Sequence, residues 1–332
     1  MNYIYFNQKY FAEKPEYNND NVLLIPEPWL AFKNRFVQIL CHAHLSPRIN
    51  SVFGLPLKKI WIPGITKCSF SKDDSICVII NAHFYDLMNA GIQKYLKGNY
   101  KSAYFVFQFS DRVDYFRNNY DSFPSIDKLK MEYDLIMTYN IEDSKRYKIT
   151  LERPCVPKIK DISNKLPDYS SDLFFVGKNK GRIETIHNIY KICQDKGLRC
   201  DFHVMDVLPK DQKYKDTISY NTPIPYMEVL ERASKTKCIL NIIQENGAGV
   251  TLRDYEAIQF NKLMLTNNTA LKETGLYRKD QMIWINELGD RIEEIQKGFQ
   301  GKSNLKNEYS QEKWYTWLEE TLKNNHSCTN IL

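Results

Sequence analysis

The sequence predicts an α/β protein with two domains, each built on a parallel sheet. Its 332 residues are enough for two domains of about 150 residues, each with its own core. Short apolar runs typical of buried strands alternate along the chain with segments of helical apolar spacing. The content of 43% hydrophobic and 26% charged residues is that of a folded globular protein.

The first half of the chain predicts strands joined by helices. Apolar runs indicate strands at 3–6, 22–25, 57–62, 76–80, 103–109 and 134–140. Helical spacing is seen at 32–45 and 86–96, and a short helix follows residue 142. Three prolines among polar residues at 154–167 mark the best candidate for a linker between domains.

The second half repeats the same alternation. Strands are expected at 173–176, 199–205, 238–243, 263–266 and 283–285. Helices are expected at 183–195, 225–234, 250–260, 286–299 and 311–322. Gly197 is the natural C-cap of the first of these helices. The last helix carries a dense aromatic cluster, which predicts that it is buried against another part of the molecule.

Two ionisable residues of the first half follow predicted strands. His83 comes after the strand at 76–80, and Asp111 comes after the next one, at 103–109. Because parallel strands end at one edge of a sheet, both side chains are expected at the edge that ligands approach. There, either residue could act as a catalytic base. Alternatively, His83 is a helix-capping or hydrogen-bonded residue and Asp111 caps the helix that follows it.

A basic glycine loop opens the second half. Gly177 follows the strand at 173–176, and Lys178 and Arg182 flank the start of the helix at 183–195. At this position the two cations could neutralise a diphosphate. The alternative is that both are solvated loop residues. The pattern is neither a P-loop nor a GxGxxG fingerprint.

A second glycine loop follows the strand at 238–243. Gly247 and Gly249 interrupt the apolar run, and helical spacing begins at Val250. A strand, loop, helix and strand of this size form a right-handed crossover, with the loop at the carboxyl edge of the sheet. The first amides of the helix, at Val250 and Thr251, are therefore expected to face an anion such as a diphosphate.

Glu256 lies about one and a half turns into that helix. A carboxylate at this depth suits two hydrogen bonds to vicinal hydroxyls, such as those of a ribose. The alternative is a cap or a salt bridge on a surface helix.

The run GVTLRDYEAIQFNKLMLTNN, which ends at Asn268, resembles the donor-site motif of bacterial surface-polysaccharide glycosyltransferases. These enzymes have the two-domain GT-B fold, and the likeness is to donor domains of the family 1 and family 4 type. In that group a glycine-led helix carries a Glu followed by Ala, and a small strand then ends in Thr and Asn. GT-B donor domains also resemble the basic loop at 177–182. One departure is Ala248, where the commonest version has another Glu; the nearest one here is Glu245.

The resemblance implies an acceptor-binding domain at 1–160, a donor-binding domain at 161–308, and a terminal helix at 309–332 that packs on the first domain. Both domains would be Rossmann-like, with their sheets facing across a cleft. Glu256 would bind the ribose, and Gly249 and the residues after it would lie along the diphosphate.

The implied activity is transfer of a sugar from a nucleoside-diphosphate sugar to a saccharide, expected to be lipid-linked, in capsule, O-antigen or exopolysaccharide synthesis. GT-B enzymes typically need no metal, and no DxD motif argues otherwise, so neither a metal nor another cofactor is expected. Whether the anomeric configuration is inverted or retained is left open.

The composition limits the compartment and the partners. No apolar run approaches the roughly 20 residues of a membrane span, and the N-terminus lacks the order of a signal peptide. This predicts a cytoplasmic protein, peripheral at most on the inner membrane face. The net charge of +6 belongs to the first 160 residues, which suits anionic lipid headgroups or a phosphorylated acceptor. The sequence has no Lys/Arg-rich helix and no RNP-type aromatic motif, so nucleic acid is not expected as a partner.

Metal and disulfide chemistry are not expected. The eight cysteines contain no CxxC pair, and the only close histidines are His42 and His44.

Two other functions are alternatives to a glycosyltransferase. A non-catalytic nucleotide-binding or scaffold protein of the same fold is favoured only by Ala248. An NAD-dependent oxidoreductase is disfavoured because no GxGxxG opens either domain.

Overall fold

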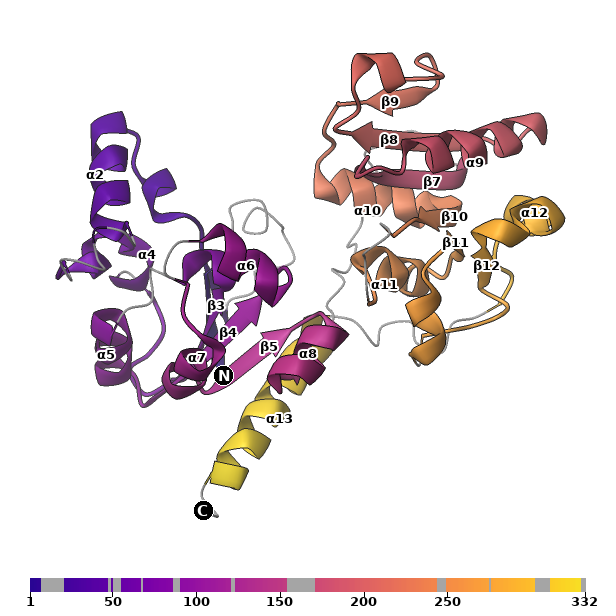
Figure 1. Ribbon diagram of the computed structural model, residues 1–332. Helices are drawn as coiled ribbons and strands as arrows, with labels where there is room; N and C mark the ends of the chain where they lie inside the picture. The colour runs from indigo at the N-terminus through magenta and orange to yellow at the C-terminus, as the bar shows by residue number, and fades with distance from the viewer. Residues whose placement is uncertain are drawn as a thin grey trace. The chain divides into compact units, whose positions relative to one another are not determined.

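The computed structural model describes residues 1–6, 21–46, 49, 55–66, 68–85, 90–120, 123–153, 171–243, 249–274, 276–301 and 311–329. The chain divides into two compact units, Met1–Arg153 with Tyr315–Leu332, and Pro154–Trp314. Each unit holds one six-stranded sheet in which all neighbouring strands are parallel (Figure 1). The predicted fold class, α/β with two Rossmann-like parallel sheets, is therefore confirmed. The predicted linker at 154–167 lies outside the described residues.

The sheet of the first unit has the strand order β2-β1-β3-β4-β5-β6. Its strands are β1 (Asn2–Phe6), β2 (Val22–Ile25), β3 (Ser75–Asn81), β4 (Ser102–Phe109), β5 (Leu135–Thr138) and β6 (Thr150–Leu151). The three central strands β1, β3 and β4 carry almost continuous runs of buried apolar residues. This is the pattern of a parallel sheet that is covered on both faces.

Helices of this unit share a single apolar core with the sheet. The α-helices of the unit, apart from its terminal helix, are α2 (Arg35–Leu45), α4 (Pro63–Thr66), α5 (Ala90–Asn99), α6 (Val113–Asn119), α7 (Ile126–Glu132) and α8 (Ile141–Tyr147). The short 3-10 helices are η2 (Pro28–Ala31), η3 (Lys58–Trp61) and η4 (Ala82–Phe84). Side chains of Asn34, Ser125 and Asn140 accept backbone hydrogen bonds at the starts of α2, α7 and α8.

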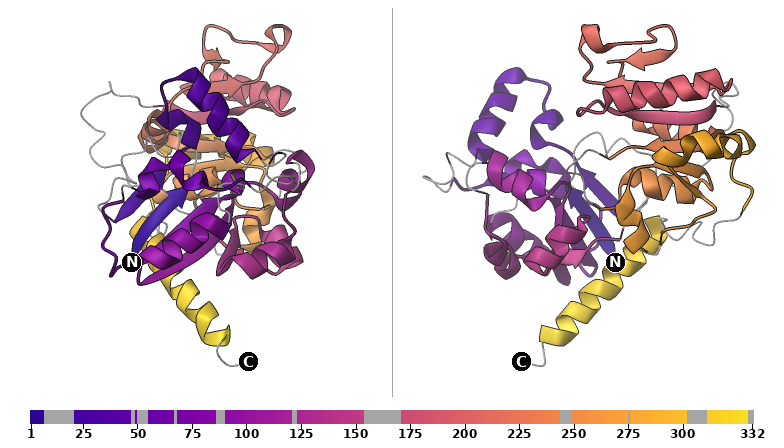
Figure 2. Two further views of the ribbon diagram at one scale, coloured as in Figure 1. Left: turned by 90° about the vertical axis from the view of Figure 1, so that its left-hand side faces the viewer. Right: turned by 45° about the vertical axis from the view of Figure 1, so that its right-hand side comes forward.

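The terminal helix α13 (Gln311–Thr329) packs against β1, although more than 300 residues separate them in sequence. The Tyr3 hydroxyl donates a 2.7 Å hydrogen bond to Glu319, and the Tyr3 ring lies 4.1 Å from that of Tyr315. Glu319 also pairs with the terminal amine of Met1 at 3.6 Å. The yellow helix accordingly runs beside the N-terminus in all views (Figures 1 and 2). The aromatic density of this helix is thus explained by burial.

The sheet of the second unit has the order β12-β11-β10-β7-β8-β9. Its strands are β7 (Ser171–Lys178), β8 (Cys200–Met205), β9 (Ile218–Tyr220), β10 (Thr236–Asn241), β11 (Leu263–Thr266) and β12 (Met282–Trp284). Helices α9 (Ile183–Asp195) and α12 (Leu288–Lys297) share one apolar core with the sheet. Helices α10 (Tyr226–Lys235) and α11 (Leu252–Gln259) share another. The adjacent residues Phe174 and Phe175 belong to different cores, so the sheet is covered on both faces.

The prediction of a strand at 57–62 is wrong. Leu57 has a φ of 60°, in the left-handed region, and the Ile60 amide donates to its carbonyl at 3.1 Å. The left-handed residue turns the chain, so the apolar run becomes the 3-10 helix η3 instead of an extended strand.

No helix of the described ranges is both long enough and apolar enough to cross a membrane.

Candidate functional site

The strand order of the second unit places a topological switch point between β7 and β10. From β7, the chain proceeds to β8 and β9 on one side of the sheet, and β10, β11 and β12 then extend the other side. In open parallel sheets, ligands bind outside the carboxyl ends of the strands at such a point. The two glycine loops identified from the sequence follow these two strands.

Arg182 connects the two sides of the switch point. Its guanidinium donates to the carbonyl of Lys178, the last residue of β7, at 2.5 Å and to the carbonyl of the next residue, Asn179, at 3.2 Å. It also donates to the carbonyl of Ile242, just after β10. A guanidinium has five N–H groups, so two of them have no partner among the described residues. Burial lowers the pKa of Arg182, which nonetheless stays a cation.

Gly177 and Lys178 are the last residues of β7, not loop residues as predicted, and they pair with Val204 and Met205. A Cβ on Gly177 would lie 3.5 Å from the guanidinium of Arg182, an ordinary van der Waals contact, and 3.3 Å from the ring of Phe175. The ammonium of Lys178 is exposed and forms a 3.1 Å ion pair with Asp206. Within the described part of the chain, Lys178 is therefore held by a weak surface contact.

A buried polar network fixes the second glycine loop. Asp254 has no exposed surface, and its carboxylate accepts from the Thr251 amide at 2.6 Å and from the Asn241 side chain at 2.6 Å. The Asn268 side chain donates to Asp254 at 3.1 Å and to the Gly249 carbonyl at 3.0 Å. The ends of β10 and β11 thereby hold the start of α11. Burial raises the pKa of Asp254, although these hydrogen bonds act in the opposite direction.

This network changes what the helix start offers to a ligand. Gly249 has a φ of 91°, which a residue with a side chain rarely adopts, and Val250 is buried in the apolar core. The sequence predicted that the Thr251 amide would face an anion. In the structure this amide donates instead to Asp254. Gly247, the other predicted glycine, lies outside the described residues.

Glu256 is fully buried in α11. Its Oε1 accepts a 2.9 Å hydrogen bond from the Tyr226 hydroxyl on α10, and its Oε2 forms an ion pair with Arg253. The alternative of a salt bridge is thus observed, but inside the protein and not on a surface helix. Arg253 is about one fifth exposed, so the pair reaches the protein surface through its guanidinium.

In the first unit, His83 lies in η4, directly after β3. Its backbone amide donates to the Asn81 side chain at 3.1 Å, and its Nδ1 lies 2.6 Å from the Tyr120 hydroxyl. Burial lowers the pKa of His83 below 6.5, against the opposing charges of Asp111 and Glu27. The ring is therefore neutral near pH 7, the form that accepts a proton.

Asp111 follows β4, whose register places it beside the end of β3. Its Oδ1 accepts from the amide of Arg112 at 2.8 Å. The first amide of α6, at Val113, donates instead to Asp143 on α8 at 2.9 Å. Asp143, and not Asp111, therefore caps this helix.

The residues that build the site from inside were not predicted from the sequence. Asp254, Asn241 and Asn268 form the buried network, and Tyr226 holds Glu256. One signal was available: Thr251 and Asp254 match the capping-box spacing [ST]-x-x-[DE]. The asparagines gave no such signal because their common partner, Asp254, lies on helix α11, 13 and 14 residues away in the sequence.

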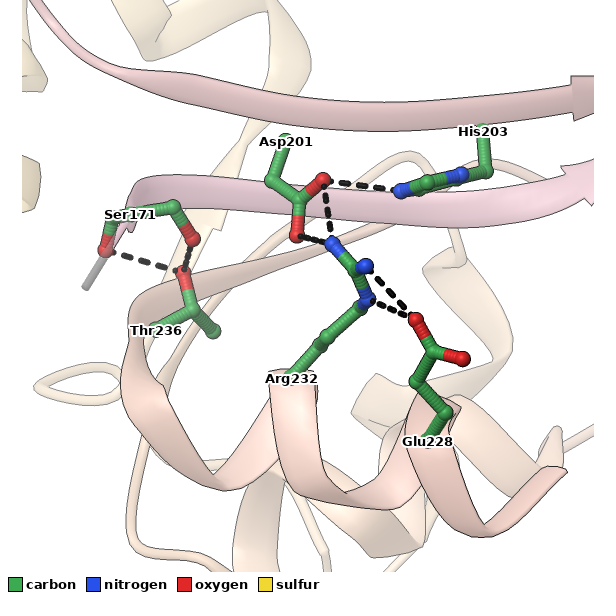
Figure 3. A network of polar contacts seen from close by, with 6 residues as sticks. All are labelled: Ser171, Asp201, His203, Glu228, Arg232 and Thr236. Atoms are coloured by element: carbon green, nitrogen blue, oxygen red, sulfur yellow. Dashed lines mark hydrogen bonds and ion pairs between the residues drawn. The ribbon is translucent and has the colours of Figure 1, made fainter. Parts of the chain in front are cut away.

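A second ionic network lies on β8, away from the carboxyl edge. Figure 3 shows Asp201 between His203, on the same strand, and Arg232 of α10. Asp201 accepts from His203 at 2.8 Å and from Arg232 at 2.9 Å, and Arg232 also contacts Glu228 at 2.6 Å. This ionic network joins the sheet to α10 and is not part of the candidate site.

Throughout the described ranges, no group of three or more His, Cys, Asp or Glu side chains is placed to hold a metal ion.

Comparison with known proteins gave no family. No family model matches the chain, and no curated protein matches its sequence.

Several solved structures match the coordinates. An α-glucosyltransferase, solved in complex with UDP-glucose and DNA containing an abasic site, is 16% identical over 73% of both chains, with a TM-score of 0.42. An α,α-trehalose 6-phosphate synthase from Burkholderia multivorans is 9% identical over 99% of both chains, with a TM-score of 0.46. The E. coli heptosyltransferase WaaC, with ADP-2-deoxy-2-fluoro heptose, is 11% identical over 89% of both chains, with a TM-score of 0.34. At these identities and scores, none of them establishes a family for this chain.

Proposed function

We propose that the chain is a nucleotide-sugar-dependent glycosyltransferase of the GT-B type. The observation that carries this proposal is the position of Arg182. Its guanidinium bonds to the strand ends on both sides of the switch point, with the Gly249 loop following one of them. A planar cation held at this edge, with two N–H groups that have no partner among the described residues, suits the diphosphate of a nucleotide sugar.

The reaction would be displacement at the anomeric carbon of the donor. The acceptor hydroxyl oxygen forms the new bond to this carbon, the bond to the diphosphate oxygen breaks, and the nucleoside diphosphate leaves with the electron pair. Arg182, assisted by Lys178, stabilises the charge on the leaving group. In an inverting reaction, His83 or Asp111 takes the proton of the acceptor hydroxyl.

The donor and acceptor sides are assigned to the two units. The unit that contains Glu256 would bind the nucleotide sugar, with Glu256 near the ribose and Gly247, Gly249, Val250 and Thr251 near the diphosphate. The other unit would bind a saccharide, lipid-linked and presented at the inner face of the cytoplasmic membrane. A hexose donor and a role in surface-polysaccharide synthesis complete the proposal.

Calorimetric titration with UDP, GDP, dTDP, CMP and NAD, each repeated with EDTA, tests the donor assignment. Micromolar binding of one nucleoside diphosphate, unchanged by EDTA, is the expected result. Binding of NAD alone, or of none of the five, would remove the basis of the proposal.

Two matched variants locate the diphosphate. Arg182→Met is expected to weaken nucleotide binding at least about tenfold, because a charged hydrogen bond contributes about 1.5–3 kcal/mol. Lys178→Met removes an exposed cation in the same loop, and its effect should stay below about threefold. Equal effects of the two substitutions would mean that only net charge matters, and that Arg182 has no special position.

The non-catalytic alternative has one observation in its favour. The Glu256 carboxylate, expected at a ribose, is already engaged by Arg253 and Tyr226. Nucleotide binding without release of free nucleoside diphosphate from any sugar donor, with saccharide acceptors supplied, would favour this alternative.

A further inference from the structure

Helix α2 of the first unit exposes an apolar face. Phe36 is 66% exposed, Ile39 57% and Leu40 44%. Their spacing of three and four residues places them on one side of the helix, and we call these three residues the α2 face. The sequence had indicated an amphipathic segment at 32–45, whose apolar side would be expected to pack inward. Figures 1 and 2 show α2 at one end of its unit, away from the sheet.

The orientation of α2 is fixed by contacts on its other side. The Trp29 ring stacks on His42 with centroids 4.1 Å apart, and the Trp61 indole donates a hydrogen bond to His44. Cys41 and Leu45 are buried in the core. The α2 face is exposed because the opposite side of the helix is anchored, so it belongs to the folded state.

The surroundings of the α2 face are basic. Residues 28–72 hold seven Lys or Arg and no Asp or Glu. Lys33 and Arg35, at the start of the helix, are both exposed. Other exposed apolar side chains are Leu30 on the neighbouring η2, Ile60 on η3, and Leu57 directly before η3. The surface thus combines large apolar side chains with an excess of positive charge, and the nearest acidic residues in the sequence are Glu27 before this segment and Asp73 and Asp74 after it.

We propose that the α2 face docks on an anionic lipid surface. Phe36, Ile39 and Leu40 would enter the boundary between headgroups and acyl chains, while Lys33 and Arg35 remain at the level of the phosphates. Each cation near such a surface contributes about a fivefold gain in affinity. A second copy of the chain fits less well, because pairing two such faces would bring like charges together.

The proposed function needs a membrane-binding surface, because its acceptor is linked to lipid. The assignment of the α2 face as that surface therefore rests on the proposed function. It concerns a different unit from the donor site. Its experiment uses no nucleotide, so its failure would leave the donor titration untouched, and a failed titration would leave it untouched as well.

The test is co-sedimentation of the full chain with vesicles of phosphatidylcholine alone or with about one third phosphatidylglycerol. The wild type is expected to pellet with the anionic vesicles and to lose most of this binding in high salt. The double variant Phe36→Ser/Ile39→Ser should bind at least about tenfold more weakly. The double variant Lys33→Glu/Arg35→Glu should also bind at least about tenfold more weakly.

Met131→Ser is the matched control. Met131 lies on α7 of the same unit and is 81% exposed, more than any residue of the α2 face. Its replacement should leave vesicle binding unchanged. Equal binding of the wild type and the Phe36→Ser/Ile39→Ser variant, or no binding of the wild type, would overturn the proposal.

Pairing of two copies through the α2 face must be distinguished from lipid binding. Sedimentation velocity without vesicles should show the same oligomeric state for the wild type and for the Phe36→Ser/Ile39→Ser variant. A wild-type dimer that this variant dissociates would assign the α2 face to a second copy and would also overturn the proposal. Unchanged thermal unfolding of the variant confirms that it is folded, as expected for exposed side chains.

Discussion

The side-chain amide of Asn268, at the end of β11, donates a 3.1 Å hydrogen bond to the buried carboxylate of Asp254 on α11. The same amide donates to the carbonyl of Gly249. The two residues therefore hold the glycine loop between a strand end and a helix start. The side-chain oxygen Oδ1 of Asn268 is buried and has no hydrogen-bond partner in the described part of the chain.

Asn268→Ala should lower the free energy of unfolding by about 1–3 kcal/mol, because Asp254 and the Gly249 carbonyl stay buried with one partner fewer. Urea unfolding at pH 7 measures this loss. Asn267→Ala is the control: its side chain is exposed and bonds to the backbone of Ile243, so its loss should stay below about 1 kcal/mol. Losses of equal size would show that the Asp254 network contributes nothing beyond an ordinary loop contact.

Glu256→Gln is expected to weaken binding of the donor nucleotide by about 1–3 kcal/mol while the protein stays folded, because a charged hydrogen bond is lost. Arg253→Gln separates binding from the internal ion pair. If Glu256 contacts the ribose, only Glu256→Gln should reduce affinity in calorimetry, whereas both variants should reduce stability. Wild-type affinity in Glu256→Gln would remove this residue from the site.

His83→Asn should reduce turnover at least about a hundredfold without changing nucleotide affinity, if His83 is the base of an inverting reaction. Because burial lowers its pKa below 6.5, the ring stays neutral at pH 7, and kcat/KM should decline only below pH 6.5. Tyr120→Phe removes the hydroxyl beside Nδ1 and should move this acid limb. An unchanged pH profile in His83→Asn would assign the limb to another group.

Asp201→Asn should destabilise the protein by about 1.5–3 kcal/mol at pH 7, because charged hydrogen bonds to His203 and Arg232 are weakened. Burial by itself would raise the pKa of Asp201, but these partners outweigh it and lower the pKa. A lowered pKa stabilises the fold above the unfolded value of about 3.9, and this contribution disappears as pH falls through the folded pKa. The difference between wild type and variant should therefore shrink below about pH 4.

Urea unfolding of both proteins at pH 7 and at pH 3.5 measures this change. Glu228→Gln is the control, since Glu228 is more exposed than Asp201 and contacts the same Arg232. It should cost less than Asp201→Asn at pH 7. A constant difference at both pH values would mean that Asp201 does not titrate between them.

Local pattern predicted most of the sheet and helix segments correctly. Strands β2 and β11 and helix α9 have the bounds that their apolar spacing indicated. The segment at 57–62 was misread because a short apolar run has the same composition in a strand and in a 3-10 turn. Only the left-handed conformation of Leu57 distinguishes the two.

By itself, the sequence determined the fold class, because the period of apolar residues fixes which segments are strands and which are helices. It also predicted Arg182 and Gly249 at the carboxyl edge, since a residue that follows a parallel strand lies there. The tertiary structure alone decided their partners. Arg182 meets the Ile242 carbonyl, 60 residues further along the chain, and Glu256 meets Tyr226 on another helix. Such contacts depend on how strands are ordered and how helices pack, which no local period encodes.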